Sequence, residues 1–544
     1  EMSASLVGSE MCIRDSDITL KIAGKPCALG ISWLRVQQQI NEIPTARLEL
    51  LIPTDSSGSA DREAQNTAAS LVIGSDVTIA LDNKTLFSGY LTSKRIMLRG
   101  KNGSIRLEAR HLLQKLAFFP SSRVFRQQDD GTILNMLLQQ GGVKMTRRTT
   151  TQLATRHEQM VQFRGSDWQF IRSRLFATNC WLVPDAASNG VTVAPLSEPL
   201  AVSHKLENYA QHSGYSLYDI DLTFDNRFTP DSLSLQGWDI TRQELSAAQK
   251  SNADSFRPWK TSGHTTTLHP RNYQLAFSTI PESAPATLAH SWINHQQLTG
   301  VQGRIVLEGT RDFQPAESIS LSQFGAGLDG TAILTGVNQL FDTVEGWRSE
   351  LLIGGMESFL PQSLPPAQSL HIATVASFTA DPQGLERIPI VLPALNLPGE
   401  HIFARLGKPW ASKASGFCFY PEPGDEVIVG FIESDPRYPV IIDSVHNPKN
   451  TAPIAPGKEN NIKGLVVNKG DYTEQLLIDT KEKTFTLSAG TTNFALAADK
   501  NIQMTAPEAM ELSAKSITYN ASETLSLTGK TKVEITGASI NMKK

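Results

Sequence analysis

Two glycine-containing segments have spacings that could bind the phosphates of a nucleotide. Gly325, Gly327 and Gly330 match the GxGxxG pattern of a dinucleotide-binding loop, and residues 529–531 end like a Walker A loop. A dinucleotide loop must open a helix, whereas the residues after Gly330 are typical of a strand. The Walker-like segment has Thr524 where the first glycine is needed, and it lies within a repeat. The sequence therefore predicts a hairpin loop and a tight corner instead of nucleotide sites.

The histidines are also poorly arranged for catalysis or metal binding. His290 and His295 are five residues apart and have no cysteine or acid at metal-ligand spacing, so we expect surface or loop positions. His157 and Glu158 lack the second histidine of a zinc protease motif, and no GxSxG nucleophile turn occurs. We predict no catalytic residue, no cofactor and no metal ligand.

Composition limits the partners of the chain. The 544 residues allow three or four domains, and 40% hydrophobic and 19% charged residues are typical of ordinary globular proteins. The net charge of −4, without a basic tail, predicts no nucleic-acid partner. No run of eighteen apolar residues could span a membrane. Four widely separated cysteines, Cys12, Cys27, Cys180 and Cys418, favour a reduced protein made in the cytoplasm.

The clearest structural pattern lies at residues 485–542, where an apolar-polar-apolar unit occurs eight times. The steps between units are 9, 8, 8, 7, 8, 8 and 7 residues, and a polar and a small residue often follow a unit. This alternation is typical of very short strands with one buried face, joined by tight corners. The sixteen apolar positions are Phe485, Leu487, Phe494, Leu496, Ile502, Met504, Met510, Leu512, Ile517, Tyr519, Leu525, Leu527, Val533, Ile535, Ile540 and Met542.

A period of eight residues is too short for one chain to enclose a core, since a single-chain β-helix needs roughly 18 residues per coil. If three chains intertwine, each forms one wall of a triangular prism, and the sixteen apolar side chains become a shared core. Each fully buried side chain then contributes roughly 1.5–3 kcal/mol. We therefore predict a trimeric β-helical needle at residues 476–544, preceded by a linker at 448–475. The alternative is an ordinary β-meander within a globular domain.

Residues 17–360 are expected to form two β-barrel-like parts with a helical insertion around residues 120–200. Helices are predicted at 132–140 and 168–176, and Ser166 and Gln169 have the spacing of a capping box at the start of the second. Strands are predicted at 17–22, 46–52, 76–81, 86–95, 104–110, 303–309 and 330–337.

A proline-rich break at residues 359–366 separates this region from a compact segment, residues 370–447. Five short strands in roughly 80 residues suit a small barrel of the OB type. The fold class is therefore mainly β and multidomain. The strands of this segment are predicted at 371–378, 385–393, 401–406, 425–432 and 439–445.

Several motifs of the compact segment are specific. They are residues 408–411 with Trp410, Gly416 and Phe417, residues 423–427 with Gly424 and Asp425, Phe431, residues 435–439 with Asp435, Pro436 and Pro439, and residues 444–447. Together they resemble the OB-domain signature of VgrG proteins, the spike proteins of type VI secretion systems and related contractile injection machines. Residues 166–171 and 87–89 resemble the hub of the same family, so the resemblance covers residues 17–544.

Two positions depart from glycines that are common in the family, Ser434 and Asp443, and we interpret both as local turn variation. The carboxylate pair Glu433 and Asp435 could serve acid–base chemistry. Because both lie in the turn signature, we predict a structural role for them instead.

The resemblance implies a structural spike. The expected partners are two further copies of the chain, the tube protein and baseplate components, effectors, and transiently the target membrane. It also implies a PAAR-repeat tip protein on the blunt end of the needle, at Ile540, Met542, Lys543 and Lys544; in the alternative, the two lysines alone keep this end soluble. The protein would be made and assembled in the cytoplasm and then ejected with the machine, which is a type VI system or an extracellular phage-like particle.

Some spikes of this family carry a hydrolase domain, so intrinsic cell-wall hydrolysis is the alternative function. Only 37 residues separate Asn447 from Phe485, and only two residues follow Met542. Because a hydrolase domain needs far more residues, we predict that the chain is not an enzyme. Residues 1–16 resemble neither a signal peptide nor the strand after them, and we interpret them as a non-native leader.

Overall fold

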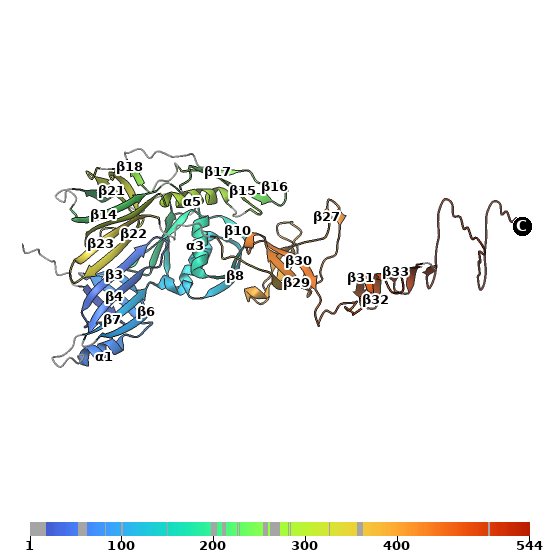
Figure 1. Ribbon diagram of the computed structural model, residues 1–544, viewed down its shortest axis with the longest axis horizontal. Helices are drawn as coiled ribbons and strands as arrows, with labels where there is room; N and C mark the ends of the chain where they lie inside the picture. Colours follow the sequence, from blue (N-terminus) through green and yellow to red (C-terminus); the bar gives the residue numbers. More distant parts are fainter. Residues whose placement is uncertain are drawn as a thin grey trace, which may run out of the picture. The chain divides into compact units, whose positions relative to one another are not determined.

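The computed structural model describes residues 18–52, 62–81, 83–99, 102–149, 151–196, 204–208, 214–225, 227, 229–253, 259–261, 272–280, 282, 284–325, 327–355, 363–498 and 501–543. The predicted leader, residues 1–16, lies outside these ranges. The chain divides into two compact units, Glu1–Val445 and His446–Lys544 (Figure 1). None of the described helices is both long enough and apolar enough to cross a membrane.

The hub region of the first unit, up to residue 355, is built on one 14-stranded sheet. Its main order is β14-β20-β23-β22-β3-β4-β7-β6-β5-β1-β2, and β13, β18 and β21 attach beside it. The bounds are β1 (Ile18–Ile22), β2 (Lys25–Pro26), β3 (Ile31–Gln39), β4 (Thr45–Ile52), β5 (Asp76–Leu81), β6 (Lys84–Arg99), β7 (Asn102–Arg110), β13 (His204–Glu207), β14 (Leu217–Phe224), β18 (Trp259–Thr261), β20 (Val301–Glu308), β21 (Ser318–Ser322), β22 (Gly330–Asp342) and β23 (Gly346–Gly354).

The alternating segments of the sequence form strands of this sheet, as predicted. In β5, for example, Val77, Ile79 and Leu81 are buried while the residues between them are not. Strand β3 pairs antiparallel with β22, so the two parts expected within residues 17–360 share one sheet. The GxGxxG segment joins the antiparallel strands β21 and β22, which confirms the hairpin loop.

A helical insertion follows the first seven strands. The capping box is confirmed: the Gln169 backbone N–H donates to Ser166 Oγ (3.1 Å), and the Ser166 backbone N–H donates to Gln169 Oε1 (3.0 Å). Ile171 and Leu175 of this helix pack in one core with Leu134 of the other predicted helix. The bounds are α1 (Arg62–Ser70) before the insertion, then β8 (Pro120–Asp129), α2 (Asp130–Gln140), β9 (Lys144–Arg147), β10 (Arg156–Ser166), α3 (Asp167–Ala177), β11 (Cys180–Pro184) and β12 (Gly190–Pro195).

A helix that the sequence analysis missed, α5 (Pro285–Leu298), contacts α3 (Figure 1). Its start has no side-chain cap, so the usual sequence signal is absent. Both histidines expected on the surface or in loops lie on it, and for His295 the expectation is wrong: its ring is buried, and this burial lowers its pKa to about 4. A small sheet packs on α5, formed by β15 (Ser232–Asp239), β16 (Glu244–Leu245), β17 (Gln249–Asn252) and β19 (Asn272–Phe277).

The predicted OB-type segment is a closed barrel with the order β24-β25-β26-β30-β29. Val161 and Phe163 of hub strand β10 lie in the barrel core, so hub and barrel share buried apolar contacts. Pro439 begins the last strand opposite Phe431. The bounds are β24 (His371–Val375), β25 (Ile388–Val391), β26 (Ile402–Leu406), β29 (Glu426–Phe431) and β30 (Pro439–Val445), with a hairpin of β27 (Ala411–Ser412) and β28 (Ser415–Gly416).

The second unit contains a five-stranded antiparallel meander that begins within the predicted linker at 448–475. The linker was therefore predicted too long, because its second half already alternates as a strand. Beyond Thr505, residues 506–543 form no strand in this single chain. The bounds are β31 (Ile462–Lys469), β32 (Tyr472–Asp479), β33 (Thr484–Ala489), β34 (Thr492–Ala497) and β35 (Ile502–Thr505).

The two departures from the family glycines differ in backbone conformation, which gives a test. Ser434 has a φ of 59°, the left-handed region that favours glycine, whereas Asp443 is extended within β30 opposite Ile428. We expect Ser434→Gly to raise the free energy of unfolding by about 0.5–1 kcal/mol and Asp443→Gly to lower it by about as much. Urea denaturation of the two variants measures the difference, and shifts of the same sign contradict this account.

Candidate functional site

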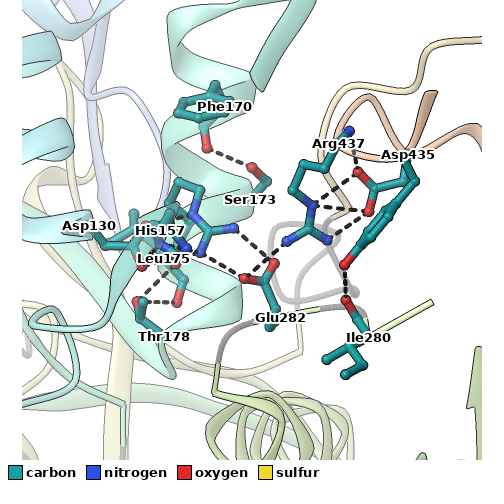
Figure 2. Close-up of polar contacts among 12 residues, drawn as sticks. Asp130, His157, Phe170, Ser173, Leu175, Thr178, Ile280, Glu282, Asp435 and Arg437 are labelled. Atoms are coloured by element: carbon teal, nitrogen blue, oxygen red, sulfur yellow. Dashed lines mark hydrogen bonds and ion pairs between the residues drawn. The ribbon is translucent and has the colours of Figure 1, made fainter. Parts of the chain in front are cut away.

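Five charged groups and one histidine meet where the hub contacts the barrel, and we call them the junction cluster: Asp130, His157, Arg174, Glu282, Asp435 and Arg437 (Figure 2). Arg174 of α3 lies between two carboxylates. Its Nε donates to Asp130 Oδ1 (2.6 Å), and its Nη1 donates to Glu282 Oε1 (2.8 Å). His157 Nε2 lies 2.8 Å from Asp130 Oδ2.

Arg437 continues the cluster from the barrel side. Its Nη2 donates to Asp435 Oδ2 (2.6 Å), and its Nη1 lies 3.5 Å from Glu282 Oε2. Glu282 therefore bridges an arginine of the hub and an arginine of the barrel. Next to it, the Tyr438 hydroxyl donates to the Ile280 carbonyl (2.5 Å), and Glu433 accepts the Ser278 backbone N–H (2.8 Å).

Opposite charges compensate burial throughout the junction cluster. Burial alone raises the pKa of Asp130, but Arg174 and His157 together lower it to about 2. Burial likewise raises the pKa of Glu282, yet Arg174 and Arg437 hold it below its usual range. Because the folded pKa of Asp130 lies below the ordinary 3.8, its stabilising contribution is present at neutral pH and is lost as the pH falls from about 4 towards 2.

The junction cluster is suited to fixing two domains against each other rather than to chemistry. Asp435 accepts both side-chain and backbone N–H groups of Arg437, in keeping with the structural role expected for it. A cavity of about 480 Å³ lies beside the cluster, and its lining includes Arg387, which is paired with Asp381. In the described ranges no group of three or more His, Cys, Asp or Glu is placed to hold a metal ion.

Sequence reasoning missed four members of this cluster, Asp130, Arg174, Glu282 and Arg437. Arg174 had a signal, because it lies three residues after Ile171 on the apolar face of its helix, where an unpaired charge is costly. Arg437 stands within the quoted motif at residues 435–439 but was not given a role. Glu282 lies in an irregular segment, and nothing in the local sequence indicates its partners.

The second candidate site is the apolar side of the meander, which we call the needle face. Its register places Leu487 beside Phe494 and Phe485 beside Leu496, and Phe494 is in turn beside Met504. The first six of the sixteen positions predicted for the trimer core thus lie on one face: Phe485, Leu487, Phe494, Leu496, Ile502 and Met504.

The needle face extends further towards the N-terminus than the octad repeat. Leu465 is opposite Leu476, and Leu476 is opposite Leu487. Ile478 joins the face opposite Phe485. The leucines are eleven residues apart instead of eight, because these strands and their turns are longer. They therefore lie outside the eight-residue period from which the needle was predicted.

The ten remaining core positions, from Met510 to Met542, lie in the segment without strands. Each exposes between 47% and 88% of its surface. Strands predicted there are thus not formed by one chain, since a strand needs a neighbour and none of the described residues provides one. Of the residues expected to bind a tip protein, Ile540, Met542 and Lys543 are exposed, and Lys544 lies outside the described residues.

The junction cluster can be tested by removing one charge. We expect Arg437→Met to lower the free energy of unfolding by about 3–5 kcal/mol, because Asp435 and Glu282 lose a buried partner. The matched control is Arg47→Met, which breaks an exposed bridge to Glu108 (3.1 Å) and is expected to cost less than about 1 kcal/mol. Adding Glu282→Gln to Arg437→Met should recover part of the loss. Equal urea midpoints for the two arginine variants contradict this role.

Two family models match the chain. One, described as the Alg8 N-terminal domain, matches residues 15–342, and the other, described as the type VI secretion system/phage-baseplate injector OB domain, matches residues 371–446. The first match covers more than half of the chain and the hub region, and the second coincides with the barrel.

A curated relative is similar to part of this chain. The actin cross-linking toxin VgrG1 of Vibrio cholerae serotype O1 is 23% identical over 376 residues, which are 63% of this chain and 33% of that protein. The match therefore spans about a third of the length of this curated relative. VgrG1 is named as an actin cross-linking toxin, and that name describes VgrG1 alone.

Solved structures share the fold. The lidded Francisella PdpA-VgrG complex has a TM-score of 0.57 at 12% identity, covering 91% of this chain and 80% of that chain. An Escherichia coli type VI secretion component, described as similar to the T4 bacteriophage tail proteins gp27 and gp5, has a TM-score of 0.51 at 13% identity, covering 78% and 99%. The hub matches the Alg8 N-terminal domain, the barrel matches the injector OB domain, and the curated relative and one of these folds carry the name VgrG. The chain belongs to the Alg8 N-terminal domain family and is a spike protein of the VgrG family of type VI secretion and phage-baseplate machines.

Proposed function

We propose that the chain acts as a structural spike in which three copies join through the needle face and form a membrane-puncturing needle. One observation carries this proposal: residues 506–543 continue the apolar repeat but have no strand partner among the described residues, and their apolar side chains are exposed. A single chain in water would leave these groups hydrated, whereas two further copies supply both neighbouring strands and a common core.

The energetic argument favours assembly. Burying each of the ten exposed side chains contributes roughly 1.5–3 kcal/mol, and pairing the strands satisfies backbone N–H and C=O groups that have no partner in a lone ribbon. The meander extends the same face by Leu465, Leu476 and Ile478. The shared core of the proposed trimer therefore starts at Leu465, before the octad repeat. It includes the longer strands of the meander and the shorter units of the repeat.

The remaining parts of the function follow from the family. We propose that the hub contacts the tube and baseplate, that a PAAR-type tip protein covers the distal repeats, and that effectors are carried with the spike. Assembly in the cytoplasm is followed by ejection with the machine and by transient contact with a target membrane. We propose that the described residues serve assembly and that none of them acts in catalysis.

The trimer can be tested with charges that differ only in the face they occupy. Ile517→Asp with Leu525→Asp places carboxylates in the shared core, where each costs several kcal/mol, and should dissociate or weaken the distal needle. Thr518→Asp with Ser526→Asp adds the same charges at the outward polar positions and should leave the mass unchanged. Sedimentation equilibrium measures this, and a folded wild-type monomer at micromolar concentration overturns the proposal.

Tip binding can be separated from trimer formation. Deleting residues 533–544 removes Val533, Ile535, Ile540 and Met542 and leaves the meander and six upstream units, so the trimer should persist while co-purification with a PAAR-type protein is lost. Replacing only Lys543 and Lys544 by alanine should retain that binding. Unchanged affinity of the shortened trimer places the docking site elsewhere on the chain.

A further inference from the structure

A hairpin on the barrel exposes four aromatic side chains. The chain leaves β26 at Leu406 and returns at Glu426, and in between lie β27 and β28. We call residues 408–420 the aromatic hairpin. Trp410 is 55% exposed, Phe417 46%, Phe419 55% and Tyr420 47%, and none of them belongs to the barrel core. Exposed aromatic groups gathered on one element are typical of a protein contact surface.

The aromatic hairpin has a defined conformation. The Phe417 backbone N–H donates to the Trp410 carbonyl (3.0 Å), and the Lys408 ammonium lies 4.0 Å from the centre of the Tyr420 ring. Gly416 has a φ of 148°, and a Cβ there would lie 2.6 Å from the Trp410 carbonyl oxygen, so the turn requires glycine. A surface held in place before binding loses little conformational entropy when it is covered.

Along the sequence, the aromatic hairpin lies shortly before the segment that is proposed to form the needle. It rejoins the barrel at Glu426, which is opposite Val445 in the β29–β30 pair. Val445 is also the last residue of the first unit, so the hairpin arises at the barrel end from which the chain continues towards the needle. Only residues 446–461 separate this end from β31.

We propose that the aromatic hairpins of the three copies pack on one another and form a second contact between protomers. This inference rests on the trimer proposed above. Sixteen residues span at most roughly 55 Å when fully extended, and a turn with the Asn447 N–H donating to the Asn450 carbonyl (3.0 Å) shortens the link. Joining the needles therefore gives the barrels a high effective concentration, and the aromatic surface that each one carries faces identical partners.

A membrane surface is the competing occupant, because tryptophan, tyrosine and lysine are common at lipid–water boundaries. The base of the hairpin is acidic, however, with Glu422, Asp425 and Glu426 following Tyr420 within six residues. These carboxylates repel anionic headgroups, which disfavours a lipid surface, while the short link to the proposed needle favours a second copy of the chain.

Cys418 lies between Phe417 and Phe419, is exposed in the single chain, and reports whether the hairpin is covered. The experiment uses the full chain with Cys12→Ser and Cys27→Ser, since Cys180 is buried and its pKa is raised to about 12, which makes it unreactive. The reference is a chain with Val344→Cys and Cys418→Ser, because residue 344 is 84% exposed in a hub turn. Maleimide labelling rates are measured together with the mass of the complex.

We expect Cys418 of the trimer to react at least tenfold more slowly than the thiol introduced at position 344. Trp410→Ala with Phe417→Ala should abolish this protection while the mass stays that of three chains, and Phe119→Ala on the hub should leave the protection intact. Equal rates in a wild-type trimer overturn the inference and leave the proposed function standing. A monomer overturns both, and protection that appears only with added phosphatidylglycerol vesicles assigns the hairpin to a lipid surface instead.

Discussion

The shared burial of the needle face is the interaction on which the proposed spike depends. In one chain, the apolar side of the meander has no covering layer among the described residues, and the repeat beyond Thr505 has no strand partner. In the single chain the described needle face is thus exposed, and the proposed trimer covers it.

The two domains of the first unit are joined in a different way. Their contact combines an apolar part, where Val161 and Phe163 enter the barrel core, with the alternating charges of the junction cluster. Apolar contacts supply free energy but little orientation, whereas bidentate arginine–carboxylate pairs fix both distance and angle. Burying such pairs is costly in desolvation, so their presence here indicates that a defined orientation of barrel and hub matters more than maximal stability.

Much of this architecture could be predicted from the sequence wherever a local period determines the structure. The alternation of Val77, Ile79 and Leu81, the capping box at Ser166, and the five barrel strands are all set by nearby residues, and the structure confirms them. Helix α5 was missed because its first residue has no cap, and Glu282 was missed because its partners are 108 and 155 residues away along the chain. The strands β31 and β32 were missed because their leucines follow a longer period than the repeat used to find the needle.

The repeat also makes the reach of the proposed needle a discrete quantity. One more unit adds one strand spacing, about 4.8 Å, and leaves every later side chain on its original face. A single inserted residue within a strand would turn all following apolar groups outward, but the steps of 7 and 9 residues show that the corners accommodate one residue more or less. Needles of this kind can therefore become longer or shorter during evolution in whole units, without any change to hub or barrel.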